Sequence, residues 1–110
     1  MRSLMIHATS AAIVAAALAA PAYAQSQFNG TWTVSRANSN TEGCGTGGSV
    51  FRITVRNGAV TAPGGSGSVS AAGAIRFPGV ANVFTGTLNG NSGSGHYSGR
   101  CSGVFSARRN

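Results

Sequence analysis

The sequence predicts an all-β fold, a small antiparallel meander or barrel of six to eight short strands closed by one disulfide. Three observations predict it: apolar residues that alternate with polar ones, turns rich in glycine, asparagine and proline between the alternating segments, and a single pair of cysteines. Period-two alternation is typical of antiparallel strands that bury one face and expose the other.

The first residues predict a Sec-type signal peptide over 1–24. Arg2 precedes the apolar run AAIVAAALAA, and Ala22-Tyr23-Ala24 has the small residues that signal peptidase requires. The run is too short for a permanent membrane span, and no later segment is apolar enough to be one. We therefore expect a periplasmic or secreted protein, cleaved after Ala24, with one small β domain over 25–110.

Five segments of the exported part alternate clearly, and turn signals separate them. Asn57-Gly58 is a strong signal for a type I′ hairpin, and Asn89-Gly90-Asn91 follows another strand in the same way. Further turns are expected at 62–65, at 72–73 and at Pro78-Gly79. Closure into a barrel would remove the exposed edges of so small a sheet. The apolar positions of the five segments are Phe28, Trp32 and Val34; Phe51, Ile53 and Val55; Ile75 and Phe77; Phe84 and Leu88; Cys101 and Phe105.

The segment GNSGSGHYSGRCSG, residues 90–103, has the composition of a flexible linker but the alternation of a strand. Counting back from Cys101 places one set inward and the other outward, in phase with the strand expected after it. Inward glycines would allow a large ring, such as that of Trp32, to lie over the strand. The inward set is Gly93, Gly95, Tyr97 and Gly99, and the outward set is Ser94, His96, Ser98 and Arg100.

Cys44 and Cys101 are predicted to form a disulfide, because both belong to the exported part of the chain. A redox or metal-binding role is the alternative, although one cysteine pair without further ligands binds metals poorly. The bond would stabilise the domain by about 4 kcal/mol. Large aliphatic and aromatic residues are few and 17 glycines must be ordered, so that composition alone would also fit a disordered chain.

The scarcity of acidic residues excludes most catalytic classes. The chain has no aspartate and no lysine, and Glu42 is its one acidic side chain. Paired-carboxylate catalysis and calcium or magnesium sites need more carboxylates, and a Ser-His-Asp triad would have to use Glu42. No lysine follows the glycines at 45–48, so this run is no P-loop. We expect no enzyme, no cofactor and no metal site; His96 and Tyr97 lie on opposite faces of a strand and cannot both reach one haem iron.

Arginine dominates the charge of the exported part. Its seven arginines face only Glu42, and most of them fall on the outward parity. Guanidinium groups suit contacts with phosphate and carboxylate, so lipopolysaccharide or acidic polysaccharide are candidate partners; simple solubility is the alternative. Few aromatic residues alternate with the arginines, which disfavours specific nucleic-acid recognition. The predicted anionic-surface site of this monomer consists of Arg52, Arg56, Arg76 and Arg100.

The order FNGTWTV, EGCG, FRITVRNGAV and LNGNSGSGHYSGRCSGVFSARR resembles a group of small, uncharacterised exported α-proteobacterial β proteins. Some of these carry automatic names that refer to haem utilisation or adhesion. The resemblance implies a fold and an export route and supplies no catalytic residues. The expected function is that of a non-catalytic, envelope-associated or binding protein. The alternatives are a small-ligand carrier of the haem type and a small-barrel protease inhibitor that would use the segment 37–48.

Overall fold

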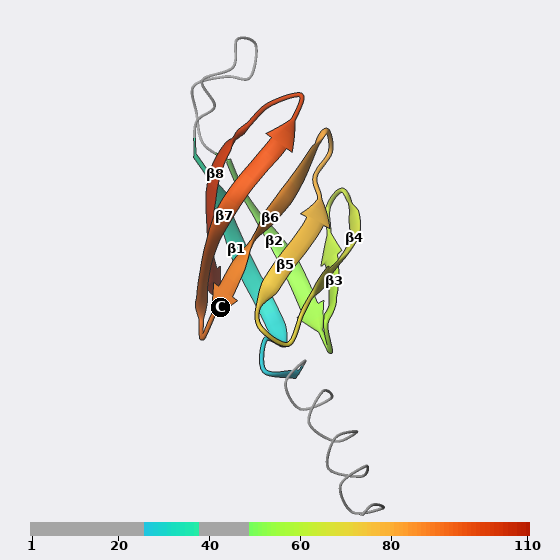
Figure 1. Cartoon of the computed structure of the whole chain (residues 1–110), viewed down its shortest axis with the longest axis vertical. Helices are drawn as coiled ribbons and strands as arrows, with labels where there is room; N and C mark the ends of the chain where they lie inside the picture. Colours follow the sequence, from blue (N-terminus) through green and yellow to red (C-terminus); the bar gives the residue numbers. More distant parts are fainter. Residues whose placement is uncertain (1–25, 38–48) are drawn as a thin grey trace, which may run out of the picture.

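The computed structural model describes residues 26–37 and 49–110, which form a closed barrel of eight antiparallel strands (Figure 1). The strands are β1 (Gly30–Arg36), β2 (Ser49–Arg56), β3 (Ala59–Ala62), β4 (Gly65–Val69), β5 (Ala74–Pro78), β6 (Asn82–Asn89), β7 (Ser92–Gly99) and β8 (Gly103–Arg109). This confirms the all-β prediction, with the strand number at the top of the expected range. Within the described residues, no helix is both long and apolar enough to cross a membrane.

The strands follow one another around the barrel in sequence order, and β8 closes it by pairing with β1. In the closing pair Val34 lies opposite Ala107, and both are buried. The arrangement is therefore an up-and-down meander without free edges, which decides between the barrel and the open sheet that the sequence left as alternatives.

The hairpin turns have the backbone conformations that their residues favour. Asn57 and Gly58 between β2 and β3 both have positive φ, 49° and 84°, as a type I′ turn requires. Between β6 and β7 only Gly90 has a positive φ, 62°, which is typical of the first central position of a type II′ turn. Both predicted hairpins are thus confirmed.

The two ends of the barrel differ in the segments that they carry. The end of the barrel where β1 finishes is called the upper end; it also carries the β3–β4, β5–β6 and β7–β8 connections (Figure 1). The lower end carries the β2–β3, β4–β5 and β6–β7 turns, the residues before β1 and the C-terminus.

Side chains fill the interior, and aromatic rings dominate its upper half. The rings of Phe77 and Phe84 stack with their centroids 4.9 Å apart. The ring of Tyr97 stacks on that of Phe84 with a centroid distance of 5.2 Å. Phe51 and Phe105 meet this stack edge-on. Since most of these rings are almost fully buried, they and the aliphatic residues of the predicted apolar sets form one core.

The segment 90–103 contains a strand, as predicted, but its end differs from the expectation. Tyr97 is buried and the outward residues of β7 are exposed. Cys101, however, lies in the β7–β8 turn and not on the last strand, and Gly99 is exposed with a φ of 150°. The alternation still predicts the inward position of Tyr97 correctly. Tyr97 pairs with Gly103 across the turn, and paired residues share a face of the sheet; because the two are an even number of positions apart, the turn does not change the alternation.

The ring beside the inward glycines is that of Phe105, not that of Trp32. A Cβ atom on Gly95 would lie 2.8 Å from Cε1 of Phe105, and one on Gly86 would lie 2.9 Å from its Cζ. Trp32 packs in the core and donates a hydrogen bond from Nε1 to the carbonyl of Phe28 at 2.9 Å. Phe105 takes this place because the register sets it directly opposite Gly95.

Several predictions concern residues outside the described ranges. These are the signal peptide 1–24, the glycines at 43–48, Glu42, Cys44 and all of the segment 37–48 except Ala37. The disulfide between Cys44 and Cys101 accordingly stays a prediction.

Candidate functional site

Each end of the barrel carries one arginine whose position in its strand has inward parity. On β1, Arg36 continues the inward set of Trp32 and Val34, and on β8, Arg109 continues that of Phe105 and Ala107. Because both are the last such positions of their strands, the two guanidinium groups lie at opposite ends of the core. Each lies over an aromatic ring, Arg36 at 5.2 Å from the centroid of Tyr97 and Arg109 at 5.0 Å from that of Trp32.

All three nitrogen atoms of the Arg109 guanidinium donate hydrogen bonds that close the lower end. Its Nη1 donates to the carbonyls of Gln27 and Asn29 at 2.8 and 2.9 Å. Its Nε donates to Oδ1 of Asn91 at 2.9 Å, and Nη2 to the carbonyl of Gly90 at 3.1 Å. Arg109 thereby ties the residues before β1 and the β6–β7 turn to the last strand, which is a structural role.

The guanidinium of Arg36 has a different environment, at the edge of a pocket of about 310 Å³ in the upper end. It donates no hydrogen bond to any residue of the described ranges 26–37 and 49–110, and these ranges contain no carboxylate side chain. We call this cavity the upper pocket; it is lined by Arg36, Ser49, Val50, Phe51, Pro63, Gly64, Pro78, Gly79, Val80, Asn82 and Phe84.

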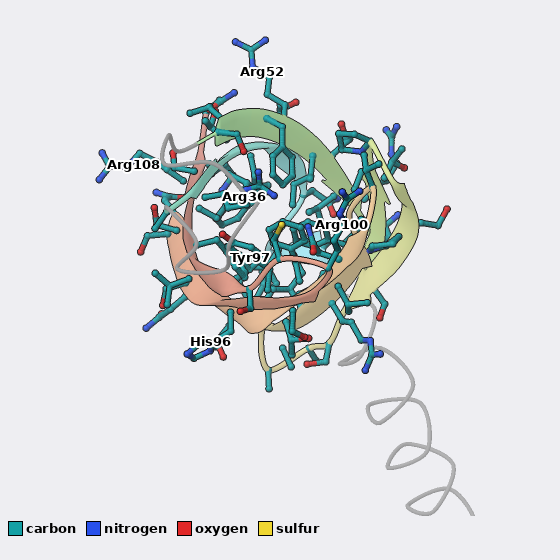
Figure 2. All side chains as sticks on the ribbon, turned by 90° about the horizontal axis from the view of Figure 1, so that it is seen from above. Arg36, Arg52, His96, Tyr97, Arg100 and Arg108 are labelled. Carbon is teal, nitrogen blue, oxygen red and sulfur yellow. The ribbon has the colours of Figure 1, made fainter. Side chains whose placement is uncertain are left out.

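Figure 2, seen from above, contrasts Arg36 with Arg52 and Arg108; Arg100 also falls within the outline of the barrel, because the β7–β8 turn lies at the upper end. Arg36 and Tyr97 lie within the ring of strands, whereas Arg52, Arg108 and His96 point away from it. The Tyr97 hydroxyl donates to the carbonyl of Ala37 at 2.8 Å, which joins β7 to the end of β1.

His96 and Tyr97 do not form a common ligand site. His96 is exposed on the outer face of β7, and Tyr97 is buried on the inner face. In the part of the chain that the structure describes, no three metal-ligating side chains gather. The stacked rings also occupy the interior volume that a haem-type ligand would need.

The exposed arginines are spread over the outer surface of the barrel. Arg52 and Arg108 lie in one cross-strand row, on either side of Thr33. Adjacent strands are about 4.8 Å apart, so their backbones lie about 10 Å apart along the sheet. This is the closest pairing of outward arginines that the register produces.

The four arginines of the predicted site do not form one cluster, because only Arg52 and Arg56 lie on the same strand, β2. The row from Arg56 on β2 to Arg76 on β5 passes through Ala59 and Ser68, and thus crosses two strands, or about 14 Å of sheet. Arg100 lies in the β7–β8 turn at the upper end. The sequence did not assign Arg108 to the site, because only the pairing of β8 with β1 brings it near Arg52.

A shallow depression of about 460 Å³ on the outer surface adjoins the pair of Arg52 and Arg108. Four of its eight lining residues carry hydroxyl groups, and Thr33 donates from Oγ1 to Oδ1 of Asn110 at 2.7 Å. We call it the hydroxyl groove; it is lined by Thr33, Ser35, Ser92, Gly93, Ser106, Ala107, Arg108 and Asn110.

No family model, no curated protein and no solved structure matches the chain in comparisons of these three kinds.

Proposed function

We propose that the protein is a non-catalytic, exported binding protein that contacts anionic polymers of the cell envelope through its outward arginines. The observation that carries this proposal is the row of Arg52, Thr33 and Arg108 beside the hydroxyl groove. No aspartate or glutamate side chain lies near these two positive charges among the described residues, which contain neither residue type.

The chemistry of this surface suits lipopolysaccharide or acidic polysaccharide. A guanidinium can hold a phosphate or carboxylate with two parallel hydrogen bonds. Serine and threonine hydroxyls both donate and accept, as sugar hydroxyls do. The net positive charge of the exported chain would in addition attract a polyanion before contact.

Retention on immobilised lipopolysaccharide or heparin tests the proposal. The double variant Arg52→Gln, Arg108→Gln is expected to elute at clearly lower salt than the native protein. We expect a loss of roughly tenfold in affinity, since each exposed ion pair contributes up to about 1 kcal/mol. Binding of the native protein should fall steeply with salt, because exposed charges act over about 8 Å at physiological ionic strength.

The matched control is Arg56→Gln, Arg76→Gln, which removes the same charge from arginines that are farther apart. If both double variants lose retention equally, net charge and not this row determines binding. If neither loses any at any salt concentration, the arginines serve solubility and the proposal is wrong.

We propose further that the protein acts outside the cytoplasm, after removal of residues 1–24. The support is the leader composition of the N-terminus and the cleavage motif that ends at Ala24. Intact mass of the protein recovered from the periplasm or medium is expected to match a chain that begins at Gln25. A protein that keeps Met1 would contradict the assignment.

The disulfide between Cys44 and Cys101 is part of the same proposal. Cys101 packs against the core at the upper end. The described residues that flank the segment with Cys44 are Ala37 and Ser49, and both lie at the upper end. The amide of Ala37 donates to the carbonyl of Val104 at 2.9 Å, and Ser49 pairs with Arg36. This placement supports a bond between the two cysteines.

A further inference from the structure

We propose that the upper pocket binds a small amphipathic carboxylate, with the carboxylate on Arg36 and the apolar part against Phe51, Phe84 and Val80. This site does not include Arg52 or Arg108, and the inference does not depend on the proposed binding of polymers.

The comparison of the two barrel ends identifies the position of the carboxylate. Arg36 and Arg109 have the same parity and the same relation to an aromatic ring. Arg109 donates four hydrogen bonds to oxygen atoms of the chain, and Arg36 donates none to the described residues. A guanidinium has five N–H donors, and a half-buried one gains most from an anionic acceptor that approaches with two oxygens.

The lining of the pocket provides for an apolar group next to that charge. Phe51 has inward parity but remains only partly buried, because its ring borders the pocket. Val80 on the rim is 93% exposed and Val50 is 69% exposed, and these are two of the three large apolar side chains that stand out from the described surface. An apolar ligand would cover them and remove their surface from water.

The single positive charge favours a carboxylate over a phosphate monoester. A phosphate carries nearly two negative charges at neutral pH, and Arg36 is the one charged residue among the described residues that line the pocket. The volume of about 310 Å³ lies at the lower limit of small-molecule sites, which indicates a ligand the size of a short fatty acid.

Titration of the purified protein with octanoate, followed by amide shifts in two-dimensional NMR spectra, tests this inference. We expect the largest shifts at the lining residues Gly64, Gly79 and Val80, and none in the turns of the lower end. Acetate has the charge without the chain and 1-octanol has the chain without the charge. Each should bind at least tenfold more weakly than octanoate.

Two variants test the two parts of the site. Arg36→Gln should weaken octanoate binding at least tenfold, because a hydrogen bond to a charged partner is lost. Arg52→Gln, which removes the same charge outside the barrel, should bind like the native protein. Val80→Glu changes an almost fully exposed side chain and should preserve the fold, but its carboxylate at the rim should repel the ligand. Its control is Val104→Glu, which changes an exposed valine that does not line the pocket.

Three results would overturn the inference. One is an octanoate titration that shifts no amide of the upper pocket. Another is equal binding by the native protein, Arg36→Gln and Val80→Glu, with all three folded by their amide dispersion. The third is binding that appears only when Glu42, the one acidic side chain of the sequence, is changed to glutamine, since Arg36 would be occupied by the protein itself in the native chain.

Discussion

The double variant Cys44→Ser, Cys101→Ser is expected to lose about 4 kcal/mol of unfolding free energy. For a domain of this size the melting temperature should then fall by roughly 20 °C. The proposed bond closes a loop over most of residues 25–110, and closing that loop in advance reduces the entropy of the unfolded state. A chain with so many glycines has much conformational entropy to lose on folding, so that this contribution decides whether the barrel forms.

Thermal unfolding followed by circular dichroism measures the effect. The native protein in reducing buffer serves as the control and should show the same lowered midpoint as the double variant. Thiol titration of the unfolded, oxidised protein should detect no free thiol. Two free thiols would show that the cysteines are not bonded to each other, and an unchanged midpoint in the variant would show that a bond between them does not stabilise the barrel.

The alternation of apolar and polar residues predicted most of the side chains that enter the core, although the predicted sets did not include Val60, Ala62, Val69 and Ala107. Trp32, Ile53, Phe77 and Leu88 were assigned inward from parity alone, and all are buried. This succeeds because a strand has a period of two whatever its partners are, so that the inner face is defined locally. The turn at Asn57-Gly58 was predictable for the same reason, since its positive φ values depend on those two residues.

The relations between strands were not predictable in the same way. Parity assigns Arg52, Arg76 and Arg108 to the outside, but only the closed strand order shows which of them are neighbours. Two strands separate Arg52 from Arg76, whereas the pairing of β1 with β8 brings Arg108 close to Arg52. Such a pairing joins opposite ends of the chain and depends on closure of the whole barrel.

The sequence carries one signal for the upper pocket. The parity that assigns Trp32 and Val34 to the core also assigns Arg36 inward, so a charged residue at the end of this inward set pointed to the mouth of a barrel. Its equivalent, Arg109, carries the same signal and has a structural role. The sequence alone could not separate the two, because the partners of Arg109 come from the residues before β1 and from the β6–β7 turn.

The substitution Gly95→Ala is expected to cost about 3 kcal/mol, since overpacking a well-packed core costs up to about that amount. Gly95 lies on β7 between Gly86 of β6 and Phe105 of β8, one residue of each adjacent strand. An added Cβ would meet the carbonyl oxygen of Thr85, the Cα of Gly86 and, at 2.8 Å, the ring of Phe105. Two of these contacts are backbone atoms, so relief requires that β6 and β7 move apart within a closed barrel.

Gly90→Ala is the matched control for this prediction, because it makes the same chemical change on an open turn. No atom lies within 4 Å of a Cβ added at Gly90, but its φ of 62° costs an L-residue about 1 kcal/mol. Gly95→Ala should therefore lower the melting temperature by roughly 15 °C, and Gly90→Ala by roughly 5 °C. Equal midpoints for the two variants would mean that the sheet can yield at Gly95 and that the close contact of β6, β7 and the Phe105 ring does not restrict this position to glycine.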